Sequence, residues 1–260
     1  MHNFLTFMGK ELTENLRTKK VLVLGCVFLL FAISSPLLAR FLGEFLNLLL
    51  PADDEMGHML ADLLGNPVWQ ESFLQYYSNL AQIGIMALLF MYMTSIQREI
   101  KTGTASLMFS KGLGFMPFVL AKFAIGSIVV VVATMVSTLV AYIYTLLLFD
   151  YAGQIVHVML GGLVFSLGAM MFLAIVLWCS TLSKSVGAVA GLGAAFYFGF
   201  AIASAIPRIG AYVPSNLLTF AIPITEGHFP DTFAANIMIA LAVMVVSLLL
   251  ATHSLKRAEG

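Results

Sequence analysis

The chain has 260 residues, of which 60% are hydrophobic and 10% are charged, and its mean hydropathy is +0.98. Soluble globular domains average about 45–50% apolar and about 25% charged residues, so the composition excludes an ordinary soluble enzyme and a disordered region. The 13 basic and 13 acidic residues cancel, which leaves no bulk positive charge to attract nucleic acid. We therefore expect an integral membrane protein that contacts the lipid bilayer and does not bind nucleic acid.

The first predicted element is an amphipathic helix over residues 3–20, lying along the cytoplasmic face of the membrane. Apolar residues recur in it at helical spacing, and Lys10, Glu11, Glu14 and Arg17 take the other face. The alternative is a short basic tail that only orients the first membrane span.

Six stretches without charged residues are long enough to cross a bilayer, which requires about 20 mainly apolar residues in a helix. These stretches are 21–39, 72–97, 123–149, 151–183, 185–207 and 232–254. A cleaved signal peptide is disfavoured for the first stretch, because Glu11 and Glu14 precede it and no A-x-A site follows it. The sequence thus predicts an all-α membrane protein with a single transmembrane domain over residues 1–260.

The distribution of charge predicts the orientation of the spans. An even number of spans puts both termini on one side, which receives eleven basic residues and leaves only Arg40 and Arg208 for the other side. Four acidic residues fall on the first side and nine on the second, so the net charges are +7 and −7. The positive-inside rule then places both termini in the cytoplasm.

Two segments are predicted on the outer side of the membrane. Loop 41–71 contains two short amphipathic pieces around the acidic cluster Asp53-Asp54-Glu55, which lacks the spacing of a calcium loop and is interpreted as solvated surface. Segment 208–231 contains Pro214 and Pro223. Because each proline removes a backbone donor, this segment predicts a re-entrant or interfacial element and not a seventh span.

The fifth span carries small residues at intervals of four positions: Gly187, Gly191, Ala195, Gly199 and Ala203. This spacing puts them on one helix face, where another helix can approach closely. Two interpretations stay open, namely a subunit interface next to a moving transport path and ordinary packing within one bundle.

Catalytic and metal-binding motifs are missing from the sequence. There is no G-x-x-x-x-G-K-[ST] or H-E-x-x-H motif, and the five histidines lack ligand spacing, so we expect no catalytic residue, cofactor or metal in this chain. His157 with Ser166 or Ser204 is the best arrangement available to an intramembrane protease, but nothing in their spacing supports it.

Ionisable groups are also missing from the centres of the spans, where ion-coupled transporters usually carry one. Arg98 and Lys122 lie near inner ends and are expected to reach water. If the protein is a transporter, we therefore expect its energy to come from a separate chain.

The cytoplasmic loop 98–122 predicts a short helix, a turn and a second helix directly beneath the membrane, with Gly103, Gly112, Gly114 and Pro117 as breakers. The alternative is a plain connecting loop.

This loop contains Glu99, then three residues, then Gly103-Thr104, followed by Leu107, Ser110-Lys111 and, at the third span, Lys122. The pattern resembles the permease subunits of ABC-2 type transporters, bacterial exporters whose ATPase is a separate chain. The N-terminal stretch from Phe7 to Arg17 is similar to the elbow helix of that family, and Tyr212-Val213-Pro214 to its outer re-entrant segment. Where the family commonly has Pro-Val-Ser-Arg after Ser-Lys, this chain has Gly112-Leu113-Gly114-Phe115, so the family's contacts in that turn are not carried over.

The resemblance implies a type V exporter-like permease in a prokaryotic plasma membrane, paired with a second permease copy or a related permease and with two ATP-binding subunits that hold ATP and Mg²⁺. It implies coupling to the ATPase through Lys10, Glu11, Glu99, Gly103, Thr104, Ser110 and Lys111, and a subunit interface through the small residues of the fifth span. Glu99 would anchor the loop by a charged hydrogen bond, Gly103 would permit the turn, and Thr104 would cap the next helix.

The spans are rich in Phe, Met and Leu, which favours an amphipathic or hydrophobic cargo such as a peptide antibiotic, a lipid or a drug. An ATP-independent scaffold or sensor and an ion-coupled secondary transporter remain alternatives. An intramembrane enzyme ranks last, because the polar constellation that it requires is missing.

Overall fold

The computed structural model describes residues 2–49 and 68–259, and every regular element in these ranges is a helix or a helical turn. Six helical segments are long and apolar enough to cross a membrane: Lys20–Leu42, Trp69–Lys101, Phe115–Phe149, Ile155–Leu182, Val186–Ser204 and Phe233–Arg257. They correspond one to one with the predicted spans. The chain is therefore an all-helical, multi-pass membrane protein.

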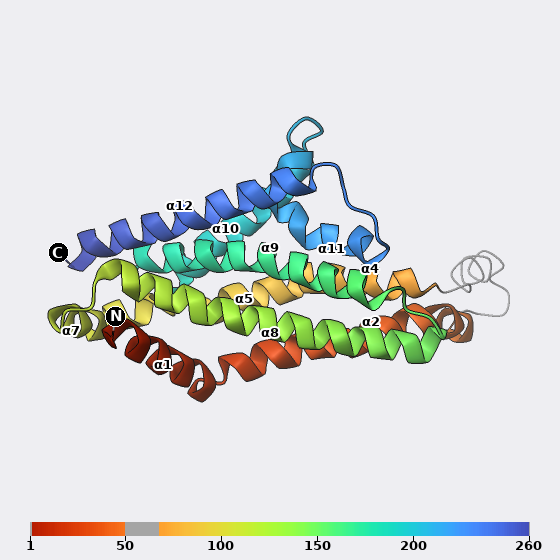
Figure 1. Ribbon diagram of the computed structural model, residues 1–260, viewed down its shortest axis with the longest axis horizontal. Helices are drawn as coiled ribbons and strands as arrows, with labels where there is room; N and C mark the ends of the chain where they lie inside the picture. Colours follow the sequence, from red (N-terminus) through yellow and green to blue (C-terminus); the bar gives the residue numbers. More distant parts are fainter. Residues whose placement is uncertain (1, 50–67, 260) are drawn as a thin grey trace.

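The long helices run roughly along one axis of the molecule (Figure 1). Helix α1 (His2–Arg17) meets α2 (Lys20–Leu49) at an angle, and α2 continues without a break through the first of the two amphipathic pieces predicted in loop 41–71. The acidic cluster and the second piece lie outside the described residues. Both termini lie at the end of the bundle that carries α7 (Thr104–Ser110), which is the arrangement that six crossings require (Figure 1).

Helix α9 (Ile155–Leu182) is the central helix of the bundle. In its most apolar stretch 72% of the residues are buried, and α8 (Phe115–Phe149), α11 (Leu217–Thr225) and α12 (Phe233–Glu259) pack against it. Glycines allow this close packing. A Cβ on Gly161 would lie 2.8 Å from the Ala221 carbonyl oxygen, and one on Gly168 would lie 2.9 Å from Leu218 Cδ2, so α11 could not approach α9 as closely with larger residues at these positions.

Segment 208–231 forms the 3-10 turns η2 (Gly210–Tyr212) and η3 (Pro214–Asn216), followed by α11. Side-chain amides hold its irregular backbone: Asn216 Nδ2 donates to the Gly210 carbonyl at 2.6 Å, and Asn236 Nδ2 donates to the Ala211 carbonyl at 2.8 Å. Such side-chain partners are what non-helical backbone requires away from water. The nine-residue α11 is too short to form a seventh span.

The second span is built from several pieces. Helix α4 (Trp69–Asn79) passes through the π turn η1 (Leu80–Gly84) into α5 (Ile85–Tyr92), and the short helix α6 (Gln97–Lys101) follows. The fifth span, α10 (Val186–Ser204), differs from the others in exposure, because only 11% of its most apolar stretch is buried.

Candidate functional site

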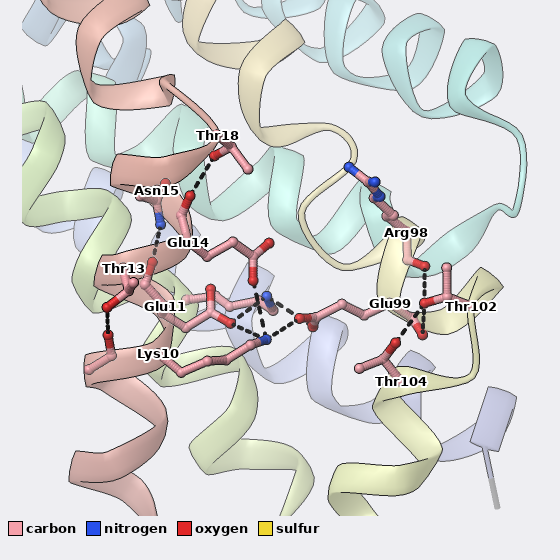
Figure 2. A network of polar contacts seen from close by, with 12 residues as sticks. Lys10, Glu11, Thr13, Glu14, Asn15, Thr18, Arg98, Glu99, Thr102 and Thr104 are labelled. Atoms are coloured by element: carbon pink, nitrogen blue, oxygen red, sulfur yellow. Dashed lines mark hydrogen bonds and ion pairs between the residues drawn. The ribbon is translucent and has the colours of Figure 1, made fainter.

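Charged side chains from α1, α6 and α8 meet in one ion network, which consists of Lys10, Glu11, Glu14, Glu99 and Lys122. Figure 2 labels the four of these residues that belong to α1 and α6. Lys10 Nζ lies 2.6 Å from Glu99 Oε1, and Lys122 Nζ lies 3.0 Å from Glu99 Oε2 and 2.9 Å from Glu11 Oε1. Lys10 also pairs with Glu14 at 3.2 Å and with Glu11 at 3.4 Å. Glu99 therefore has a cation on each carboxylate oxygen, and so the network ties α6 to both α1 and α8.

The centre of the ion network is buried. Glu11 and Lys122 are each 2% exposed and Glu99 is 6% exposed, whereas Lys10 and Glu14 lie at its half-buried edge. Unpaired charges at such positions would cost several kcal/mol each. Docking of α1 is therefore favourable only in the register in which the charges meet their partners.

The two groups at the edge keep their charges. Burial acts to lower the pKa of Lys10, but the hydrogen bond to Glu99 and the charges of Glu99, Glu11 and Glu14 outweigh it and raise this pKa above its ordinary value. Burial acts to raise the pKa of Glu14, and the charges of Lys122 and Lys10 reverse the effect and lower it. The contact between Lys10 and Glu14 is therefore a charge-assisted ion pair at neutral pH.

Aromatic and amide side chains enclose the ion network. The rings of Phe7 and Phe118 stack with their centroids 5.4 Å apart, and Lys122 Nζ lies 5.1 Å from the Phe118 centroid, within cation–π distance. Asn15 Nδ2 donates to the Glu11 carbonyl at 2.9 Å, and the Tyr92 hydroxyl donates to Asn15 Oδ1 at 3.3 Å. These contacts shield the charges from water and extend the connection of α1 to the second span.

One carboxylate oxygen from each of Glu11, Glu14 and Glu99 lies within 4.8 Å of the other two, a separation that could suit a metal ion. The ammonium groups of Lys10 and Lys122 already bind these carboxylates. We therefore assign the cluster as an ion network and not as a metal site.

The turn between α6 and α7 follows the sequence prediction in one respect and departs from it in another. Gly103 has a φ of +71°, a left-handed conformation that favours glycine, so its expected role is confirmed. Thr104 was expected to cap the next helix, and this prediction is wrong. The N-cap position of α7 falls on Gly103, because that residue completes the turn, and Thr104 is the first helical residue, with its hydroxyl 2.8 Å from the Thr102 hydroxyl.

Only some of the residues predicted for coupling to an ATPase lie together in the structure. Lys10, Glu11 and Glu99 come together in the ion network, and the charged hydrogen bond expected for Glu99 is present. Ser110 and Lys111 are exposed at the C-terminal end of α7 and take no part in the network. Leu107, one turn before Ser110, is 64% exposed. Leu107, Ser110 and Lys111 are therefore exposed in the part of the chain that the structure describes, while Glu99 pairs with Lys10 and Lys122 on the inner side of the preceding helix.

The predicted environment of Lys122 is wrong. It was expected to reach water, yet it is 2% exposed and pairs with Glu11 and Glu99. The physical reason is that the two carboxylates satisfy the charge within the protein. An available signal was that a lysine inside an apolar run requires a counter-ion, and that Glu11, Glu14 and Glu99 were the nearest acids predicted on its side of the membrane.

A hydrogen bond links α6 to the turn that precedes the fifth span. Gln97 is 2% exposed, and its Nε2 donates at 2.5 Å to the carbonyl of Lys184, which lies in the turn between α9 and α10. Displacement of α6 would therefore act on the start of α10 as well as on the second span.

A small pocket lies further along the second span. It has a volume of 120 Å³, and Ala81 of η1, Tyr197 and Ser204 of α10 and Thr219 of α11 contribute to its lining. The Tyr197 hydroxyl donates to the Ala81 carbonyl at 2.9 Å. π turns are rare in α-helices and frequently occur at functional sites. The pocket thus joins the second and fifth spans where the helix geometry is irregular.

Four of the five small residues that the sequence places on one face of α10 are not packed against the described part of the chain. Gly187, Gly191, Ala195 and Gly199 are exposed, and Ala203 is half-buried. A Cβ on Gly191 or Gly199 would meet no heavy atom within 4 Å. Ordinary packing within residues 2–49 and 68–259 therefore does not explain the pattern.

The arrangement considered for a protease does not form in the described ranges. The Ser166 hydroxyl donates to the Gly162 carbonyl and the Ser204 hydroxyl donates to the Ala201 carbonyl, each at 2.8 Å within its own helix. His157 instead lies beside Gly227.

A scan against protein-family models found no match, and no curated protein sequence matches the chain.

Proposed function

We propose that this chain is the membrane-spanning subunit of an ATP-driven exporter of the ABC-2 type. The observation that carries the proposal is the ion network. It joins the amphipathic N-terminal helix to the loop with the Glu99–Gly103–Thr104 pattern, across 89 positions of sequence. These are the two segments that the sequence resemblance assigns to contact with an ATPase. Because ion pairs join them, we expect the two segments to move together.

The exposed surface of α7 provides a place for the ATPase to act. Leu107 and Lys111 lie on this surface, and Glu99 holds the preceding α6 through a buried ion pair with Lys122 and a half-buried ion pair with Lys10. A force on α7 would pass through α6 into the second span and, through the Gln97–Lys184 hydrogen bond, into the fifth span. ATP and Mg²⁺ are bound by the partner, whose closure shifts the permease toward the conformation that contacts it better.

The cargo path in this proposal runs beside the pocket between the second and fifth spans. The pocket combines apolar residues with the hydroxyl groups of Ser204 and Thr219, which suits an amphipathic or hydrophobic molecule. The exposed small residues of α10 would then face a second permease copy or a related permease across the path. The positive side of the protein, with both termini, faces the cytoplasm of a prokaryotic cell.

Co-purification tests the proposal. The tagged chain is extracted from its native host in mild detergent, and co-purifying proteins are quantified by mass spectrometry. We expect a P-loop ATPase at about one copy per permease. Lys111→Glu, which reverses a charge on α7, should lower its recovery at least tenfold.

The matched control is Lys256→Glu, which makes the same charge change at an exposed position near the end of α12 and should leave ATPase recovery unchanged. If the wild-type protein brings down no ATPase from cells that express one, the proposal is wrong and an ATP-independent or ion-coupled function takes its place. Equal losses in the two variants would remove α7 from the docking surface.

A further inference from the structure

An apolar groove lies where α1 and α2 pack against α8. It has a volume of 290 Å³, and all ten residues that line it are apolar, including Leu12 and Leu16 of α1, Gly25 of α2 and Val132 and Val136 of α8. Figure 1 shows α1 and α2 meeting at an angle beneath α8. Leu12 is 42% exposed and Leu16 is 57% exposed, so α1 turns leucines outward along this groove.

The groove is open at Gly25, a lining residue that has only a hydrogen in place of a side chain. A Cβ on Gly25 would meet no heavy atom within 4 Å. The chain also turns sharply between the two helices, where Lys19 adopts a φ of +58°. A methyl group at position 25 would therefore have no close neighbour, so close packing of helices does not require a glycine there.

Three basic residues follow closely in the sequence at the corner between α1 and α2, the two helices that border the groove with α8. Arg17 ends α1, Lys19 lies in the turn, and Lys20 begins α2. Arg17 and Lys19 are exposed, and no acidic side chain in the described ranges lies within ion-pair distance of either. The corner therefore presents Arg17 and Lys19, without an ion-pair partner in the described ranges, where the two helices that border the apolar groove meet.

We propose that the groove binds an acyl chain of an anionic phospholipid, whose phosphate contacts Arg17 and Lys19. An alkyl chain matches a lining without polar side chains, and basic residues beside an amphipathic helix attract anionic lipids. A second copy of the chain fits less well, because two positively charged corners would repel each other. The bound lipid would brace α1 from outside while the ion network holds it from inside. This site does not depend on the proposed transport function.

Native mass spectrometry of the purified chain tests the site. The protein in detergent is incubated with phosphatidylglycerol or phosphatidylcholine carrying the same acyl chains. We expect phosphatidylglycerol to bind at least tenfold more tightly. Gly25→Leu, which fills the groove, should weaken this binding at least tenfold. Cys26→Leu, which adds apolar volume at an exposed neighbouring position outside the groove, should leave it unchanged.

The charge part of the site is tested separately with Arg17→Gln/Lys19→Gln, which leaves the groove as it is. This variant should bind the two lipids equally, and it decides the test if Gly25→Leu fails to fold, as judged by size-exclusion chromatography. Equal binding of both lipids to the wild-type protein, or equal phosphatidylglycerol binding by Gly25→Leu and Cys26→Leu, would overturn the proposal. So would a wild-type dimer that Gly25→Leu dissociates, because the groove would then hold a second copy.

Discussion

Removal of the buried ammonium group by Lys122→Met is the sharpest test of the ion network. The network contains three carboxylates and two ammonium groups, and the change leaves the three carboxylates with Lys10 alone. Glu11, which is 2% exposed, loses its partner at 2.9 Å and keeps only Lys10 at 3.4 Å. Removing one partner of a buried ion pair costs about 3–5 kcal/mol, because the other charge stays buried without compensation.

The assay is thermal unfolding in detergent. At about 2–4 °C per kcal/mol, Lys122→Met should lower Tm by roughly 6–20 °C. The control is Lys184→Met, because the Lys184 side chain is exposed and forms no ion pair in the described ranges. A surface change of this kind is expected to stay within about 0.5 kcal/mol of wild type.

A double-mutant cycle with Glu11→Gln separates the charge pair from general packing. If Glu11 is destabilising once Lys122 is gone, Glu11→Gln should recover at least about 1 kcal/mol in the Lys122→Met background, although it destabilises the wild-type protein. Strict additivity in the cycle, or equal Tm shifts for Lys122→Met and Lys184→Met, would refute the reasoning.

Three further predictions follow from single features of the structure. Gly103→Ala should destabilise the fold by about 1–2 kcal/mol because of the φ of +71° at this position, whereas Gly9→Ala inside α1 should stabilise the fold by about 0.5–1 kcal/mol. Neither added methyl group would have a neighbour within 4 Å, so the difference reports on backbone conformation, and Tm measures both changes. The raised pKa of Lys10 contributes stability that is fully present below the ordinary pKa of 10.5 and is lost as pH rises through the pKa of the folded state, and the lowered pKa of Glu14 contributes stability that is present above 4.5 and is lost as pH falls through the pKa of the folded state. Tm should therefore decline at both extremes of pH. Lys10→Met should remove the part of the alkaline decline in Tm that Lys10 causes. Gly191→Leu should reduce dimer mass in mild detergent without changing the monomer fold, and the exposed neighbour Ala188→Leu should not; equal dimer mass in the two variants would count against the α10 interface.

The sequence predicted the elements whose cause is local. A helix that crosses a bilayer requires a long apolar run, so the six spans could be counted from the long uncharged stretches of the sequence. The turn at Gly103 was also predicted, because a left-handed residue has a local signature. The Thr104 cap was wrong, since the exact first residue of a helix depends on where the preceding turn ends.

Partners that are distant in the sequence could not be read from it. Lys122 meets Glu11 across 111 positions, and Lys10 meets Glu99 across 89. Periodicity grouped Glu11 with the polar face of α1 but did not say that this face turns inward. That orientation depends on tertiary packing against Phe118 and Tyr92, which local patterns do not encode. The fold was thus largely predictable, whereas only Lys10, Glu11 and Glu99 of the ion network were predicted as site residues, and the pairing of Lys122 with two of them was missed.

The distribution of side chains around α1 bears on where this helix lies. Phe7, Glu11 and Asn15 recur every four residues on the buried side, whereas Leu12 and Leu16 are exposed. In water this arrangement would be unfavourable twice over, because it buries a carboxylate and exposes leucines. At the edge of a bilayer both costs fall: lipid covers the leucines, and Lys122 and Lys10 neutralise the carboxylate. Apolar residues could replace a buried ion network with little loss of stability, so what the charges add is a single register for docking. This distribution of side chains favours a position of α1 at the membrane surface, and the ion pairs with Glu99 and Lys122 favour one register of α1 against α6 and α8.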